Sequence, residues 1–349
     1  MTTLIVGDIH GCFDELMHLV AKADFAPSDL IVSVGDLVDR GPKSYEVVRY
    51  FASDSVHRLA VLGNHEEKHI KGERPETADP SGRIVKRTVS AAQYQEMLGY
   101  LRTLPLFLDL PEVLVVHAGL EPGVPLDRQK PAVLTGRGSQ GRPGFDGKST
   151  PWYDNLGFSW PKPVVFGHVS GPEVVRGLRY NVWGLDTGAA VGGALTGLIV
   201  PEFRVVSEPT PDYYAESLRH WLPVFLVEDL AGLPWRTVLS LVAADWPAEV
   251  GERIIAAQEM YGTVVARLER EVGELVVRTR WSSLDPEAKG RIARGLRGEP
   301  RFATPLGRLL LHCFPVGPTL QLIEAAFPTP EALARALTES SPKNEGSML

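Results

Sequence analysis

The sequence has few cysteines and no long apolar run. Only Cys12 and Cys313 occur among its 349 residues, so a disulfide framework is excluded and reduced thiols are expected. No apolar run approaches the roughly 20 residues that a membrane span needs. The first residues also lack the basic and apolar regions of a signal peptide. We therefore expect a cytoplasmic protein that does not enter a membrane.

An excess of positive charge is also missing. The formal net charge of −7 argues against general attraction to nucleic acid or to anionic membranes, although a local basic groove at a phosphate site stays compatible with it. Hydrophobic residues make up 44% and charged residues 23% of the chain, as in ordinary globular proteins. The length favours two domains, or one large domain with an appendage.

Short apolar runs alternate with helical spacing in the first part of the chain. This alternation predicts an α/β fold whose strand-end loops carry the functional residues. A predicted hairpin around Pro201-Glu202 makes the later part of this domain mostly β. The predicted strands are residues 4–6, 30–34, 58–62, 113–116, 164–166, 194–200 and 203–207, and the predicted helices are 13–22, 43–53 and 90–104.

The character of the sequence changes after residue 208. Glu208-Pro209-Thr210-Pro211 is typical of a linker, and an N-cap residue followed by proline then recurs at Asp285, Thr304 and Thr329. Apolar residues recur at helical spacing over 248–272. We predict a phosphate-site domain over 1–208, a mainly α-helical accessory domain over 212–340 and a disordered tail over 341–349.

Short motifs rich in Gly, Asp and His follow five of the apolar runs. Such motifs place polar side chains at rigid strand ends, where several can converge on one ligand. The motifs are Gly7-Asp8-Ile9-His10-Gly11, Gly35-Asp36-Leu37-Val38-Asp39-Arg40-Gly41, Gly63-Asn64-His65-Glu66, His117-Ala118-Gly119 and Gly167-His168.

This set can hold two metal ions side by side. Asp8 and His10 stand two residues apart and can face one ion, while Asp36 opens the neighbouring loop and is the natural bridging carboxylate. Nitrogen and oxygen ligands without thiolate favour manganese first, with iron, zinc or nickel as alternatives, over calcium or copper(I). The other expected ligands are Asn64, His117 and His168.

Two such cations about 3.5–4 Å apart can share a hydroxide that attacks a phosphorus atom in line. The attack then needs no side-chain nucleophile, but the leaving alkoxide needs a proton. His65 is the candidate acid, Asp39 can orient its ring, and Arg40 offers a two-pronged contact to phosphate. These residues predict a phosphoesterase.

The motifs resemble the phosphoprotein phosphatase superfamily, whose pattern GDxHG, GDxxDRG, GNHE, HAG and GH occurs here complete and in order. The resemblance implies a calcineurin-like metallophosphoesterase β-sandwich flanked by helices. It also implies the acid pair His65 and Asp39, and Arg40 on the phosphate. The implied ligands are Asp8, His10 and Asp36 for one metal, and Asp36, Asn64, His117 and His168 for the other.

A narrower resemblance covers residues 1–208. The segments 11–16, 185–188 and 192–196 are similar to the phosphatase domain of bacterial polynucleotide kinase-phosphatase and to bacterial diadenosine-tetraphosphatase-like proteins. In that group the residue matching Asp186 supports catalysis. Asp186 can equally be a turn residue before Gly188.

Three further features have two readings each. Arg137 and Arg142 can bind substrate phosphate or belong to a solvated loop. The aromatic residues near 152–160 can stack a nucleobase or anchor the loop. A basic helix near 289–301 can bind nucleic acid or form a solvated face. The aromatic residues are Trp152, Tyr153, Phe158 and Trp160, and the basic ones are Lys289, Arg291, Arg294, Arg297 and Arg301.

Three functions remain open on the sequence. The first, slightly favoured, is a phosphoesterase acting on nucleotides, RNA ends or dinucleoside polyphosphates. The second is a Ser/Thr phosphoprotein phosphatase that uses the helical domain to dock its partner. The third is a non-catalytic regulatory protein that binds metal. In each case a protein or nucleic-acid partner for the helical domain is conceivable.

Overall fold

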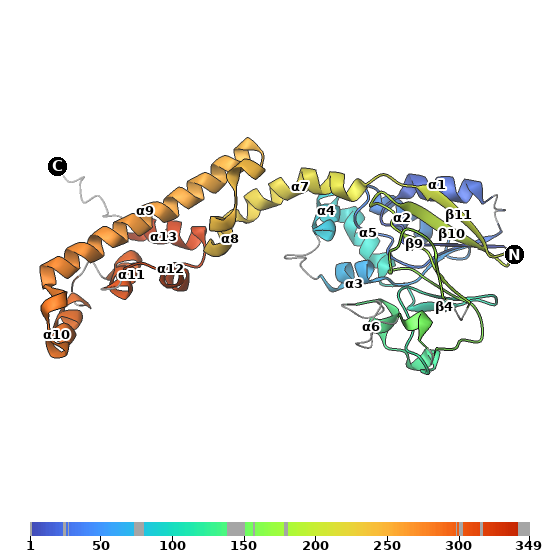
Figure 1. The fold of residues 1–349 in the computed structure, drawn as a ribbon. Helices are drawn as coiled ribbons and strands as arrows, with labels where there is room; N and C mark the ends of the chain where they lie inside the picture. The colour runs from blue at the N-terminus through green and yellow to red at the C-terminus, as the bar shows by residue number, and fades with distance from the viewer. Residues whose placement is uncertain are drawn as a thin grey trace. The chain divides into compact units, whose positions relative to one another are not determined.

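The computed structural model describes residues 2–340 apart from 24, 25, 27, 73–79, 138–150, 156, 157, 178–180, 298, 300–302, 315 and 316. The chain divides into two compact units, Met1–His220 and Trp221–Leu349, which are described one by one (Figure 1). Arg142, Arg301 and the predicted tail 341–349 lie outside the described residues.

The first unit is a mixed α/β structure in which strands and helices alternate. Its strands are β1 (Thr3–Val6), β2 (Leu30–Ser33), β3 (Arg58–Ala60), β4 (Phe107–Asp109), β5 (Leu114–Val116), β6 (Val164–Phe166), β7 (Val175–Arg176), β8 (Val182–Gly184), β9 (Asp186–Thr187), β10 (Ala194–Val200) and β11 (Arg204–Pro209). Its helices are α1 (Phe13–Lys22), α2 (Ser44–Ala52), α3 (Asn64–Lys71), α4 (Ser81–Thr88), α5 (Ala91–Leu101) and α6 (Pro131–Leu134).

The strands form two sheets. The first has the order β11-β10-β1-β2-β3, with β9 paired to β10, and the second has the order β4-β5-β6-β8-β7. Strands β1, β2 and β3 run parallel to one another, as do β5, β6 and β8. The carboxyl ends of parallel neighbours meet at one edge of a sheet, so the loops that follow these strands lie close together.

Side-chain alternation along the strands builds the layers of this unit. Ile5 of β1 and Val32 of β2 join Val165 of β6 in a core shared by both sheets. Leu4 and Val6 point the other way, into a second core that α1 and α2 cover. Figure 1 shows α1 and α2 beside the first sheet. Successive residues of a strand face opposite sides, so each sheet packs on two layers.

The far face of the second sheet packs against the aromatic residues near 152–160. Trp152, Tyr153 and Phe158 are buried against Phe166 and its neighbours, and the Trp152 indole nitrogen donates a hydrogen bond to the Ala118 carbonyl oxygen at 3.1 Å. Buried side chains cannot stack a nucleobase, so these three residues anchor the loop to the core.

The predicted strands and helices of the first unit are found in the structure, but several observed elements were not predicted, among them the short strands β4 and β7 and the helix α6. Helix α1 has the predicted bounds, and β10 spans the predicted residues. The helices α3 and α4 were not predicted. The proposed linker start was wrong, because β11 continues through Glu208 and Pro209, which pair with Leu195 and Ala194.

The second unit is helical throughout its described residues. Its core gathers apolar side chains from every one of its longer helices, with Trp235 and Ile254 fully buried. Proline follows an N-cap residue at Pro286, Pro305 and Pro330, as predicted. The helices are α7 (Tyr213–Asp229), which begins in the first unit, α8 (Trp235–Ser240), α9 (Ala248–Thr279), α10 (Pro286–Arg297), α11 (Pro305–Cys313), α12 (Leu320–Ala326) and α13 (Pro330–Ser340).

Among the described residues, every helix is either too short or too polar to span a bilayer.

Candidate metal centre

The predicted ligands lie in the loops after five parallel strands. In the first sheet, two of these loops follow β1 and β2, and the third connection leads from β3 into the start of α3. In the second sheet, the two loops follow β5 and β6. The structure brings these loops together although they are up to 160 residues apart in sequence. The loop residues are Asp8 and His10, then Asp36, Asp39 and Arg40, then Asn64 and His65, and finally His117 and His168.

Five of these residues have left-handed backbone conformations. The φ angles are 45° for His10, 51° for Asp36, 76° for Asp39, 63° for Arg40 and 62° for His168. Residues with a Cβ atom rarely adopt positive φ, and each instance costs on the order of 1–3 kcal/mol. Such a cluster persists only where the surrounding structure enforces it, and clusters of this kind mark functional sites.

Two motif glycines allow the close approach of buried carboxylates. A Cβ atom on Gly63 would lie 2.2 Å from Asp36 Oδ1, and one on Gly167 would lie 1.9 Å from Asp8 Oδ1. Both distances are far inside van der Waals contact, so any side chain at these positions would displace an acidic group. The glycines therefore shape the site as much as the charged residues do.

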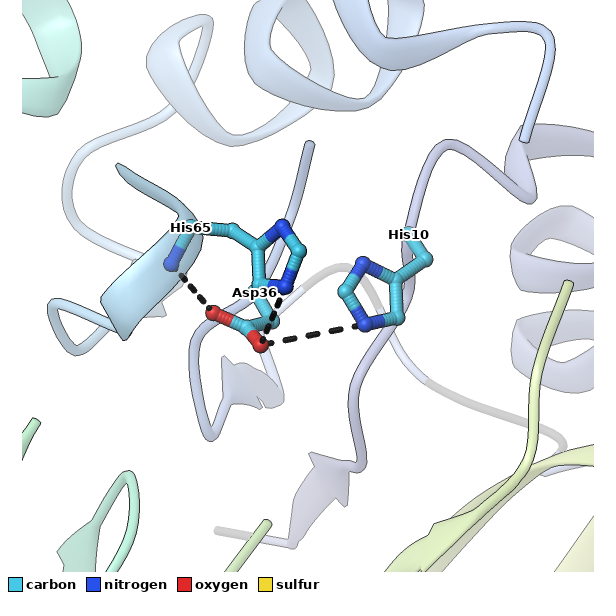
Figure 2. Close-up of side chains that lie close together, drawn as sticks. All are labelled: His10, Asp36 and His65. Atoms are coloured by element: carbon cyan, nitrogen blue, oxygen red, sulfur yellow. Dashed lines mark hydrogen bonds and ion pairs between the residues drawn. The ribbon is translucent and has the colours of Figure 1, made fainter. Parts of the chain in front are cut away.

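Asp36 lies at the centre of two groups of donor atoms. In the first group, Asp36 Oδ2 is 3.7 Å from His10 Nε2 and 4.0 Å from His65 Nε2 (Figure 2). In the second group, Asp36 Oδ1 is 3.5 Å from His117 Nε2, and His168 completes the set. One carboxylate thus offers each of its oxygens to a different cluster, which is the arrangement expected of a bridging ligand.

Asn64 joins the second group. Its Oδ1 atom lies 3.0 Å from His117 Nε2 and 2.9 Å from His168 Nδ1. The backbone N–H of His65 meanwhile donates to Asp36 Oδ1 at 3.0 Å (Figure 2), which fixes the central carboxylate relative to α3. The amide oxygen and the two imidazoles therefore converge on the same small volume as Asp36.

The histidine ring orientations fit metal binding. His10 Nδ1 and His117 Nδ1 each donate a hydrogen bond of 2.9 Å to a backbone carbonyl oxygen, that of Val38 and Val34 respectively. A neutral ring that donates through Nδ1 has a lone pair at Nε2, so Nε2 of His117 faces an acceptor oxygen of Asn64. Two lone pairs that face each other repel, but a cation bound between them makes the arrangement favourable. At metal sites a histidine that binds the metal through one ring nitrogen commonly donates a hydrogen bond from the other.

The separations within each group also fit a cation. Ligand atoms bound at about 2.0–2.2 Å around one ion lie on the order of 3–3.5 Å from one another. The 3.5 Å and 3.7 Å separations from Asp36 to His117 and His10 come close to this range. They are long for hydrogen bonds.

Three buried carboxylates create a demand for positive charge. Burial, followed by the charges of Asp186 and Asp36, raises the pKa of Asp8 well above its usual value. Burial and the Asp36 charge also raise the pKa of Asp186. At Asp36, burial raises the pKa, but the surrounding imidazoles, with His117 foremost, lower it below its ordinary value. Divalent cations would relieve the repulsion among these acids.

Asp8 differs from its predicted place in one respect. Both of its oxygens accept a hydrogen bond from the backbone N–H of His168, at 3.1 Å each, and it belongs to neither converging group. Its role as a ligand stays a prediction.

The ring of His65 is fixed between two carboxylates. Its Nδ1 atom lies 2.6 Å from Asp39 Oδ2, so Nε2 is turned toward Asp36 and the metal groups (Figure 2). Burial lowers the pKa of His65, but the charges of Asp36 and Asp39 outweigh burial and raise it overall. A raised pKa favours the protonated form of the ring.

The predicted phosphate contacts lie at the edge of the site. Arg40 is partly exposed, and its guanidinium carbon lies 5.9 Å from the centre of the Tyr214 ring. Arg137 is partly exposed too, and its Nη1 atom lies 3.8 Å from Glu67 Oε1. Arg142 lies outside the described residues. Asp186 accepts a turn hydrogen bond from Gly188 N–H at 3.1 Å, which supports its reading as a turn residue, and its charge also acts on Asp8. Its support of catalysis stays a prediction.

Two buried residues with contacts at the site were missed by the sequence analysis. Glu66 accepts hydrogen bonds from the backbone N–H groups of Asp36, Leu37, Val38 and Gly63 and so fixes the bridging loop to the start of α3. His69 contacts Asp39. The signal for Glu66 was its place in Gly63-Asn64-His65-Glu66, three residues after the helix N-cap.

Relatives of the chain were found among curated proteins and solved structures. A symmetrical bis(5'-nucleosyl)-tetraphosphatase of Buchnera aphidicola is 37% identical over 125 residues, covering 35% of this chain and 45% of the relative. One from Shewanella sp. (strain W3-18-1) is 38% identical over 144 residues, covering 39% and 51%. The chain thus spans about half the length of these relatives. A structure described as a candidate diadenosine tetraphosphatase is 32% identical, covers 60% of this chain and 94% of its own, and has a TM-score of 0.49.

A family model matches a larger share of the chain. The model, described as calcineurin-like phosphoesterase, matches residues 1–186 of the 349. The matched segment contains the strands β1 to β8 and every predicted metal ligand. Because the match covers more than half of the sequence, the chain belongs to the calcineurin-like phosphoesterase family.

Proposed function

We propose that this chain hydrolyses phosphoesters at a pair of divalent cations, manganese foremost, held around Asp36. The observation that carries this proposal is the sharing of Asp36 between two groups of donor atoms. Asp8, His10 and Asp36 would hold one cation, and Asp36, Asn64, His117 and His168 the other. When bound, the cations would supply an activated water and positive charge for the phosphate oxygens.

The side chains around the cations have separate tasks. Arg40 would bind the non-reacting phosphate oxygens with its guanidinium group. His65, held by Asp39, would donate a proton from Nε2 to the leaving oxygen. Asp186 adds negative charge beside Asp8 and so favours cation binding.

For the substrate we favour dinucleoside polyphosphates and other nucleotide phosphoesters. The support is the identity of 37–40% to relatives named symmetrical bis(5'-nucleosyl)-tetraphosphatase. The aromatic ring of Tyr214 beside Arg40 is compatible with a nucleotide, because a ring next to a phosphate contact can stack a base.

Phosphomonoesters with alkoxide leaving groups are the second candidate, and phosphoserine in a protein belongs to this class. The buried His65–Asp39 pair favours this class of substrate. An alkoxide leaving group is strongly basic, so it needs a proton from an acid far more than a nucleotide phosphate leaving group does. In that case the helical unit would be the docking module.

A substrate panel with added manganese tests the proposal. It compares diadenosine tetraphosphate, a 2′,3′-cyclic nucleotide, a phosphoserine peptide, p-nitrophenyl phosphate and bis-p-nitrophenyl phosphate, with Asp36→Asn as the reference. We expect the highest kcat/KM for diadenosine tetraphosphate, with two ADP as product. A preference for the peptide would favour the second candidate. Metal binding without any turnover would contradict hydrolysis and support a regulatory protein.

A further inference from the structure

A line of buried hydrogen bonds leads away from the site through His65. Asp39 Oδ2 lies 2.6 Å from His65 Nδ1, and Asp39 Oδ1 lies 2.9 Å from His69 Nε2. His69 Nδ1 in turn lies 2.9 Å from the Tyr94 hydroxyl. Asp39, His65 and His69 are all at most 5% exposed. The Asp39 carboxylate thus forms hydrogen bonds with two imidazoles, and of these the His65 ring faces the metal groups.

The hydrogen-bonding capacity of these groups allows one consistent direction. An ionised carboxylate only accepts, so both imidazoles donate to Asp39. A neutral His69 that donates through Nε2 accepts at Nδ1, where the Tyr94 hydroxyl can donate. Asp39 therefore selects the Nε2–H tautomer of His69, and the Tyr94 hydroxyl holds the ring at Nδ1. His69 in turn fixes Asp39, and Asp39 fixes the His65 ring with Nε2 toward the site.

Two helices and a tight turn hold this line of hydrogen bonds in place. His65 and His69 are four residues apart on α3, so they lie on the same helix face and reach the same carboxylate. Tyr94 comes from α5. The backbone N–H of Asp39, at a φ of 76°, donates to Ser44 Oγ at 3.0 Å.

Helix α4 covers one side of this line of hydrogen bonds. A Cβ atom on Gly82 of α4 would lie 3.6 Å from His69 Cε1 and 3.8 Å from Asp39 Oδ1. The α4 backbone therefore packs close over the contact between His69 and Asp39. Because Asp39 and His69 are also almost fully buried, their orientation depends mainly on the side chains that they contact.

We propose that His69 and Tyr94 are positioning residues for the acid step of the hydrolysis, which act on His65 through Asp39. The proposal rests on the proposed function, because it needs His65 to protonate the leaving oxygen. Neither residue touches the reacting atoms. Without them Asp39 can rotate about its side-chain bonds, and the His65 ring loses the fixed direction of its Nε2 proton.

The sharpest test varies the leaving group. With manganese present, kcat is measured for aryl phosphates from p-nitrophenyl phosphate to phenyl phosphate, since only poorer leaving groups depend on the acid. His69→Leu should slow phenyl phosphate by about 10- to 100-fold, the usual range for residues that orient a site. It should slow p-nitrophenyl phosphate much less, and KM should change little. Tyr94→Phe should give a smaller change in the same direction.

Two further variants separate positioning from folding. His69→Gln keeps an N–H near the place of Nε2 and should restore most of the rate on phenyl phosphate. Tyr45→Phe is the matched control, because the Tyr45 hydroxyl donates to Glu96 at 2.7 Å and has no link to His65. It should leave the dependence on the leaving group as in the wild type.

A spectroscopic measurement gives a readout apart from activity. In protein labelled with ¹⁵N-histidine, Tyr94→Phe should shift the resonance of His69 Nδ1, because this nitrogen loses its hydrogen-bond donor, while Tyr45→Phe should not. Equal slowing of all aryl phosphates, or an unchanged His69 spectrum, would overturn the proposal. A wild-type protein that hydrolyses none of the esters would instead contradict the proposed function itself.

Discussion

In the unit Met1–His220 the interior holds many ionisable side chains, whereas the described part of Trp221–Leu349 buries no Asp, Glu, His, Lys or Arg. The buried ionisable residues of the first unit are Asp8, His10, Glu15, Asp36, Asp39, His65, Glu66, His69, His117 and Asp186. The core of the second unit is built from Leu, Val, Ile, Trp and other apolar residues.

This contrast separates stability from chemistry within one chain. Taking a charged group out of water costs several kcal/mol unless partners compensate it, so a cluster of buried acids and imidazoles is a poor way to stabilise a fold. The described core of the second unit is apolar, so burial of apolar side chains contributes most of its packing. Loss of a charged residue should therefore affect function in the first unit, and loss of an apolar residue should affect stability in the second.

The largest effect is expected from Asp36→Ala. Removing the carboxylate shared by both donor groups should abolish manganese binding and lower kcat/KM by more than about 100-fold, since even residues that only support ligands cost about 10- to 100-fold. Asp245→Ala, an exposed acid of the second unit, is the control and should change neither. Metal titration and phosphoesterase assays on both variants measure this. If Asp36→Ala still bound manganese, this buried acid would matter no more for the metal than the exposed control acid Asp245, and the contrast between the two units would be wrong.

His65→Ala should separate acid catalysis from metal binding. We expect a loss of about 10²- to 10⁴-fold on alkyl phosphates, the range for general acid catalysis, and a much smaller loss on p-nitrophenyl phosphate. Manganese affinity should persist. Because His65 also lies in one converging group, loss of the metal in this variant would make it a ligand and the acid assignment wrong.

Trp235→Ala should act on the second unit alone. Its side chain is fully buried, and a tryptophan-to-alanine change in a core costs about 3–5 kcal/mol in the free energy of unfolding. Val277→Ala, at a position that is 78% exposed, should change it by less than about 0.5 kcal/mol. Chemical unfolding followed by tryptophan fluorescence checks the loss, and hydrolysis of p-nitrophenyl phosphate checks that the metal site survives. If Trp235→Ala abolished hydrolysis, the units would not be independent.

The smallest effect is a dependence of metal affinity on pH. The pKa of Asp8 is raised, so its carboxyl group takes up a proton at a higher pH than an ordinary aspartate and then competes with the metal. Below that pKa, manganese affinity should fall by about tenfold for each pH unit and each proton displaced. Titration calorimetry between pH 5 and pH 8 measures it. Affinity that rises as the pH falls would contradict this assignment of the site.

The sequence predicted local features better than contacts between distant segments. The bounds of α1 and the proline-marked starts of α10, α11 and α13 follow from capping and periodicity within a few residues, and these predictions are confirmed. Helix α3 was missed because its residues are mostly polar and its first residue belongs to a ligand motif. The strand-end motifs predicted which residues would meet, since parallel strands bring their ends together.

Contacts made by side chains outside the motifs could not be predicted in this way. The place of His69 depends on the phase of α3, and that of Tyr94 depends on how α5 packs against it. Neither residue belongs to a motif, and no local pattern relates Asp39 to a histidine 30 residues away. Such contacts follow from tertiary packing, which a single sequence reveals only weakly.

The central claim is that Asp36 joins two cation sites in one centre. A titration of the metal-free protein with Mn²⁺, followed by electron paramagnetic resonance, tests it most directly. The account predicts two ions per chain with the magnetic coupling of a bridged pair, and loss of the coupling in Asp36→Ala. A single uncoupled ion per chain, or two ions that stay coupled in Asp36→Ala, would contradict it.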